Sequence, residues 1–185
     1  LEAFRSDEWV LGIVAGLIVL GALGYLAIFE VITIRRPRRF SLETKIVLIG
    51  SIALLILGTA TVYALENDNE KTIGGLSTPN QIGDSFFNAT IARTAGFSID
   101  DFGEHEDTTN IVLEVLMFIG GASASTAGGI KINTVAMIVI TIMATVRGRR
   151  NLSAFNRDIP QDLARRALVI GALAVFTVGF FVILL

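Results

Sequence analysis

Cysteine is absent from this 185-residue chain, and histidine occurs only once, at His105. Without cysteine the chain has neither disulfides nor thiolate metal ligands. A lone histidine with no second ligand nearby in the sequence indicates a surface residue rather than a metal site. The sequence also shows no Ser-His-Asp set, no paired carboxylates in a pocket and no zinc pattern. We therefore expect neither enzyme activity nor a covalently bound cofactor.

Charged residues are scarce as well. They make up 17% of the chain, whereas a soluble domain carries about 25%. Hydrophobic residues reach 52%, the mean hydropathy is +0.68, and the apolar residues gather in long runs. This composition predicts a membrane protein. The chain has no signal-peptide pattern and both of its ends look cut, so we expect a fragment of a longer membrane protein.

Three apolar segments are long enough to cross a bilayer, which takes about 20 helical residues. They are residues 10–34, 45–65 and 167–185. The first contains glycines, which let helices approach one another closely. A basic run with Pro37 follows it and stops the helix. We expect each segment to form one spanning helix.

Charge divides the loops into two groups. Residues 35–45 and 147–166 are basic, whereas residues 66–70 and 100–107 are acidic. The positive-inside rule places the basic loops in the cytoplasm, so the acidic loops lie outside. Residues 81–98, between two outside loops, must then enter and leave the membrane from the outer face. The acidic loops either concentrate cations at a pore mouth or are simply soluble loops.

The re-entrant stretch combines a segment too short to cross the membrane, 81–93, with small residues after it. Non-helical backbone is tolerated at membrane depth where it is buried in protein or lines a water-filled path. Rings of backbone carbonyls replace the hydration shell of an ion in cation filters, and glycine permits backbone angles closed to other residues. The stretch is therefore either a turn between two helices or an ion filter made by Thr94, Ala95, Gly96 and Phe97.

A second interruption is expected inside residues 110–146, because a continuous helix of that length would measure about 55 Å and a hydrocarbon core is about 30 Å thick. Lys131 lies in mid-segment, where an ionisable residue indicates function by default. The alternatives are a snorkelling lysine or a partner for a buried carbonyl. Because Ile130 precedes Lys131, the stretch is not a phosphate-binding loop. Before Ile130, the interruption comprises Gly120, Gly121, Ala122, Ser123, Ala124, Ser125, Thr126, Ala127, Gly128 and Gly129.

Two stretches, in this order and spacing, resemble the Trk/Ktr/HKT family of potassium-translocating membrane subunits: Arg93-Thr-Ala-Gly-Phe-Ser98 and Gly120–Lys131. Residues 155–160 are similar to a cytoplasmic stretch of the bacterial TrkH and KtrB type, and the likeness covers most of the chain. Family members often have Gly-Ser-Pro-Gly where this chain has Gly121-Ala-Ser-Ala124. This departure favours a stiffer or more helical loop.

The resemblance implies an all-α membrane protein that contains one helix–pore-loop–helix repeat of a pseudo-fourfold cation channel, with a broken inner helix. Residues 1–44 would hold the inner helix of the preceding repeat and a basic loop. Residues 45–150 would form the repeat itself, and 151–185 a cytoplasmic linker and the first helix of the next repeat. Potassium would bind the backbone carbonyls of the filter at Thr94, Ala95 and Gly96, above a gating loop at 120–131.

The same resemblance implies a multi-pass protein of the cell membrane, plasma or inner, that transports potassium, with sodium as a second possible ion. Its partners would be the remaining repeats of the same chain, a second copy in a homodimer, the lipid bilayer, and a cytosolic nucleotide-binding ring of the TrkA/KtrA type. Nucleic acid is not expected.

Two other functions remain compatible with the residues. A secondary transporter would use the broken helix at 120–131 as its binding site, but it gives no role to the short segment at 81–98. A structural membrane subunit would have no ion pathway, and changing Gly96 would not affect ion flux.

Overall fold

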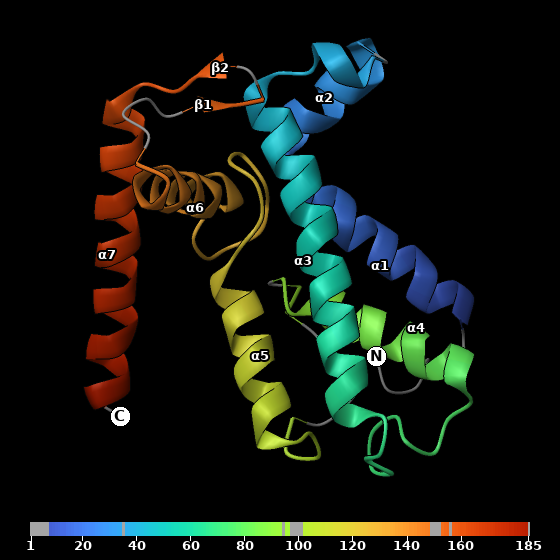
Figure 1. Cartoon of the computed structure of the whole chain (residues 1–185). Coiled ribbons are helices and arrows are strands. Elements are labelled where there is room, and N and C mark those ends of the chain that lie inside the picture. The colour runs from blue at the N-terminus through green and yellow to red at the C-terminus, as the bar shows by residue number, and fades with distance from the viewer. Residues whose placement is uncertain are drawn as a thin grey trace.

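The computed structural model describes residues 8–34, 36–93, 95–96, 102–148, 153–155 and 157–184. This part of the chain is almost entirely helical, as predicted (Figure 1). The two strands form a short antiparallel hairpin. In chain order the elements are α1 (Glu8–Leu23), α2 (Tyr25–Ile34), the 3₁₀ turn η2 (Pro37–Arg39), α3 (Leu42–Glu66), α4 (Thr78–Ile91), α5 (Asp107–Phe118), α6 (Ile132–Val146), β1 (Ser153–Ala154), β2 (Arg157–Asp158) and α7 (Gln161–Leu184).

The central element is α3, a helix of 25 residues. The Ser41 side chain caps its first turn by accepting a hydrogen bond from the Thr44 amide at 3.2 Å. Helices α4 and α5 pack against α3 near Gly58, where an added Cβ would lie within 3.0 Å of side chains from both. Buried residues recur along α3 at every third or fourth position, which gives one inward-facing stripe: Val47, Ser51, Leu55, Gly58 and Val62.

Helices α3 and α7 are long and apolar enough to cross a membrane, as predicted for residues 45–65 and 167–185. Residues 10–34, predicted as one spanning helix, do not form a continuous helix. This segment breaks at Gly24 into α1 and α2, which are bent by 95° relative to each other. Gly24 has a positive φ of +74°, a conformation that favours glycine.

Basic and acidic loops lie at opposite ends of the molecule. In Figure 1, η2, the β1–β2 hairpin and the beginnings of α3 and α7 are at the top, and the loops that precede α4 and α5 are at the bottom. Helix α4 lies beside the second half of α3, whereas α5 rises from the bottom and ends partway up. Helix α6 then runs across the molecule beside α7. This arrangement agrees with the separation of charge, and the orientation in a membrane remains a prediction.

Candidate functional site

The short helix α4 has 14 residues, too few to cross a bilayer. Pro79 in its first turn suits a helix start, and the helix ends at the C-cap Ala92. Of the predicted filter, Ala95 and Gly96 follow this end, whereas Thr94 and Phe97 lie outside the described residues. Gly96 has a positive φ of +81°, and an added Cβ would meet no described atom within 4 Å. Backbone conformation, rather than crowding, therefore accounts for glycine at this position.

Arg93 links the end of α4 to α3, a role that the sequence did not reveal. Its side chain is only 2% exposed, and its Nη2 atom donates to the Ser51 hydroxyl oxygen at 3.2 Å. Its Nε and Nη1 atoms find no hydrogen-bond partner in the part of the chain that the structure describes. A cation here lies at the C-terminal end of a helix, where the helix dipole favours positive charge.

The predicted interruption lies between α5 and α6, and residues 120–131, all of which are described, form no helix. The loop closes on itself at its base. The Gly120 amide donates to the Ile130 carbonyl at 2.9 Å, and the Ile130 amide donates to Phe118 at the same distance. Ala124 has a positive φ of +59°, so the expected tendency toward a helical loop is not observed.

Glycine is required at this base because the two ends of the loop approach closely. A Cβ added to Gly120 would overlap the Gly128 carbonyl oxygen. At Gly129, which has a φ of +70°, it would lie 2.8 Å from the Phe118 carbonyl oxygen. These glycines are therefore necessary for the folded loop, whatever its function.

Lys131 is the N-cap residue of α6. Its ammonium group donates to the Ala127 carbonyl oxygen at 2.6 Å. Of the alternatives that the sequence left open, the structure thus favours a lysine that partners a loop carbonyl. The bond holds the second half of the loop against the start of α6.

The filter stretch and the loop border one cavity. Its volume is about 380 Å³, and Arg93 and Ala95 face Thr126 and Ala127 across it, with α1 as a further wall. A larger groove of about 610 Å³ between α3 and α6 has an almost wholly apolar lining. That groove suits lipid or another helix, so the smaller cavity is the candidate site for an ion.

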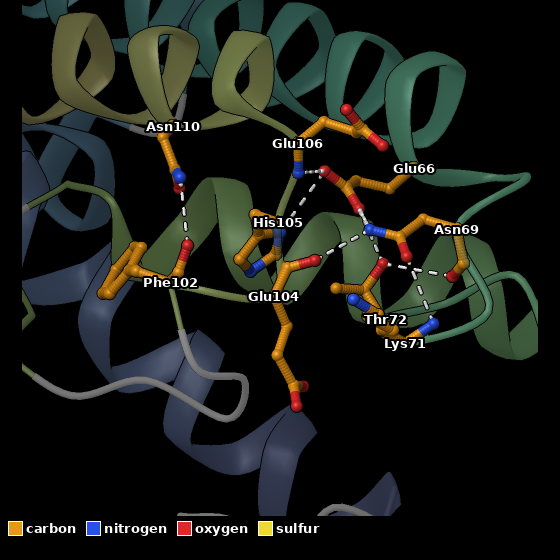
Figure 2. Close-up of polar contacts among 9 residues, drawn as sticks. All are labelled: Glu66, Asn69, Lys71, Thr72, Phe102, Glu104, His105, Glu106 and Asn110. Carbon is orange, nitrogen blue, oxygen red and sulfur yellow. Dashed lines mark hydrogen bonds and ion pairs between the residues drawn. The ribbon is translucent and has the colours of Figure 1, made fainter.

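A polar cluster holds the acidic loops together at the other end of α3 (Figure 2). Its centre is Glu66, which is fully buried at 0% exposure. The Glu66 carboxylate accepts hydrogen bonds from Thr72 Oγ1 at 2.6 Å, Asn69 Nδ2 at 2.7 Å and the Glu106 amide at 2.9 Å. The start of α5 and the loop after α3 are therefore fixed to the same carboxylate.

His105 belongs to this cluster, so its prediction as a surface residue was wrong. It is 6% exposed, and its Nδ1 atom lies 3.5 Å from Glu66 Oε1. No local pattern could predict this contact, because 39 positions separate the two residues and only the packing of α5 beside α3 brings them together. Among the described residues, no group of three or more His, Asp or Glu side chains is placed to bind a metal ion.

The sequence of this chain matches a known protein family over its whole length. The family model described as "TrkH: Cation transport protein" matches residues 1–185, the whole chain. The chain belongs to this family. The members of this family are multi-pass membrane proteins that transport cations, and it is not a family of enzymes.

Characterised relatives carry names that refer to potassium. The chain is 36% identical over 178 residues to the Ktr system potassium uptake protein B of Bacillus subtilis, covering 96% of this chain and 40% of the relative. It is 33% identical to the protein of the same name from Vibrio alginolyticus, covering 100% of this chain and 42% of the relative. It is also 30% identical to the potassium/sodium uptake protein NtpJ of Enterococcus hirae, covering 92% and 38%. The chain thus spans about two fifths of the length of these relatives.

A solved structure supports the fold. The crystal structure of the potassium transporter TrkH from Vibrio parahaemolyticus matches with a TM-score of 0.69, covering 91% of this chain and 36% of that chain. At 18% identity this likeness concerns the fold alone.

Proposed function

We propose that this chain contributes one complete repeat, with parts of the repeats before and after it, to a protein that moves potassium across the cell membrane. The observation that carries the proposal is the cavity of about 380 Å³ bordered by both Ala95 and Thr126. A re-entrant helix followed by open backbone, directly next to an unwound intramembrane loop, is an arrangement that suits an ion path and has no use in a simple helical bundle. The names of the relatives make potassium the first candidate ion and sodium the second.

In this proposal the ion loses its water at the filter. Carbonyl oxygens of Thr94, Ala95 and Gly96, with Phe97 after them, would replace the hydration shell of potassium. The remaining carbonyls of the ring would come from other repeats of the same protein. The positive φ of Gly96 supports this role, because it allows a backbone orientation that other residues rarely adopt.

The loop at 120–131 would act as a gate on the cytoplasmic side of the filter. It borders the same cavity as Ala95, and backbone hydrogen bonds hold it together at its base. Hydrogen bonds of this kind contribute about 1 kcal/mol each, so the loop can change conformation at modest cost. The bond from Lys131 to Ala127 would stabilise the blocking conformation.

The proposed partners follow from the same reasoning. Residues 1–44, 45–150 and 151–185 would belong to three successive repeats of one pore. The basic end of the molecule, which includes Arg36, Arg38 and Arg39, would face the cytoplasm and bind a nucleotide-binding regulatory ring, and two copies would form a homodimer.

A secondary transporter is the second candidate, because both the α1–α2 segment and the α5–α6 segment are broken, and broken helices form the binding sites of such transporters. Reconstitution of the complete protein in liposomes separates the candidates. A pore gives single-channel currents in a potassium gradient, whereas a carrier gives saturable flux without unitary currents. Flux no greater than in protein-free liposomes contradicts the proposal.

A further inference from the structure

The break at Gly24 leaves the last carbonyls of α1 without partners in their own helix. The loop at 120–131 uses two of them. The Ala122 amide donates to the Ala22 carbonyl oxygen at 2.8 Å, and the Thr126 amide donates to Gly21 at 3.4 Å. An unbroken α1 would pair these carbonyls with amides four residues later. The break in one helix therefore supplies acceptors for the unwound backbone of the other.

The fit between α1 and the loop depends on missing side chains. A Cβ added to Gly24 would lie 2.9 Å from the Ser123 carbonyl oxygen, and one added to Gly21 would lie 3.0 Å from Thr126 Oγ1. From the other side, a Cβ on Gly121 would lie 2.6 Å from the Ala22 carbonyl oxygen. Both surfaces are thus shaped for close contact of backbone with backbone.

The second half of α2 is fixed to the start of α3 through Glu30. The Glu30 carboxylate accepts hydrogen bonds from the Ser41 amide at 2.5 Å, from the Ser41 hydroxyl at 2.7 Å and from the Thr44 hydroxyl. Since α2 is held in this way, a change of angle between α1 and α2 takes place at Gly24. Such a change moves the carbonyls of Gly21 and Ala22 relative to the loop.

We propose that Gly21, Ala22 and Gly24 are positioning residues of the gate, so that the broken helix α1–α2 holds the loop in its blocking conformation. The inference rests on the proposed function, because it requires the loop at 120–131 to limit ion flux. Release of the loop then requires loss of the bonds to Ala22 and Gly21, and a movement of α1 removes both acceptors together. The gate consists of two broken helices rather than one.

A steric test uses Gly21→Ala in the complete transporter. The new methyl group meets Thr126 Oγ1, and overpacking of this kind shifts an equilibrium by about five-fold or more. We expect a rise in basal potassium flux of about that size in liposomes. Thr126→Ala in the same protein removes the clashing hydroxyl and restores flux toward the original value. Gly16→Ala is the matched control, since a Cβ there meets no described atom within 4 Å.

A second test joins the two elements covalently and benefits from the absence of native cysteine. In the double variant Gly21→Cys, Thr126→Cys, the two side chains are close enough for a disulfide, since a Cβ added to Gly21 lies 3.0 Å from Thr126 Oγ1. We expect the oxidised protein to lose potassium flux and a reductant to restore it. Each single cysteine variant should show no redox effect.

The outcomes separate the inference from the proposed function. The inference alone is overturned if the original protein transports potassium normally and neither Gly21→Ala nor the disulfide changes the flux. Failure of the cysteine pair to form a disulfide contradicts the contact itself. Absence of flux from the original protein overturns the proposed function, and the inference with it.

Discussion

The Nη2 atom of Arg93 donates to the Ser51 hydroxyl oxygen at 3.2 Å and thereby joins the end of α4 to the middle of α3. Both residues are 2% exposed. The contact fixes the backbone two residues before Ala95, so the position of the proposed filter depends on a buried arginine. Replacing a buried ion by an apolar residue of similar length is often neutral for stability, whereas removing the partner of a buried charge is costly.

We therefore predict that Ser51→Ala destabilises the protein by about 1–3 kcal/mol, because a further N–H of Arg93 loses its partner. The same substitution should cost much less when Arg93 is replaced by Met. A double-mutant cycle on thermal unfolding in detergent measures this coupling. Equal costs of Ser51→Ala in both backgrounds would contradict the contact.

The Glu66 cluster gives a second prediction. Glu66→Gln replaces one carboxylate oxygen by an NH₂ group, which cannot accept a hydrogen bond from the neighbouring donors, and we expect a loss of about 2–3 kcal/mol. Limited proteolysis should then cut the segment 67–76 faster. The matched control is Glu114→Gln on the exposed face of α5, which should change stability by less than about 0.5 kcal/mol. Similar effects of the two substitutions would show that the buried cluster is not important.

Deletion of Ala122–Ala127 should raise potassium flux and weaken control by the regulatory ring, because it removes the backbone that borders the cavity. Lys131→Ala should raise flux more mildly, since it removes only the bond to Ala127. Lys71→Ala in the exposed loop after α3 is the control for loss of a lysine. The measurement is the potassium flux of each variant, compared with that of the original protein, in correctly inserted protein. An unchanged flux after the deletion would mean that the loop is not the barrier and serves helix packing.

Much of this fold could be predicted from local properties of the sequence. The lengths of the apolar runs indicated α3 and α7, and the impossible length of a helix over residues 110–146 indicated the interruption near 120–131. Residues 10–34 were different, because a nearly all-apolar segment of this length suits one spanning helix. The break at Gly24 is set by contact with Ser123, nearly 100 positions later in the chain.

The site was predictable only in part for the same reason. The small residues at 94–97 and the glycines at 120–129 stand out in the sequence, since both require unusual backbone. Arg93 and His105 do not stand out, because their burial depends on Ser51 and Glu66 in another helix. Contacts between distant segments leave no local pattern in a single sequence.

The most direct test of the account is the ion selectivity of the complete transporter with Gly96→Ser. A side chain at a positive φ strains the backbone, so Gly148→Ser is the matched control: Gly148 has a φ of +64°, and a Cβ there also meets no described atom within 4 Å. Potassium and sodium uptake are measured in a host that lacks its own potassium uptake. The account predicts weaker potassium uptake and poorer discrimination against sodium for Gly96→Ser alone. Unchanged uptake and selectivity in that variant, or the same defect in both variants, would contradict a filter at Gly96.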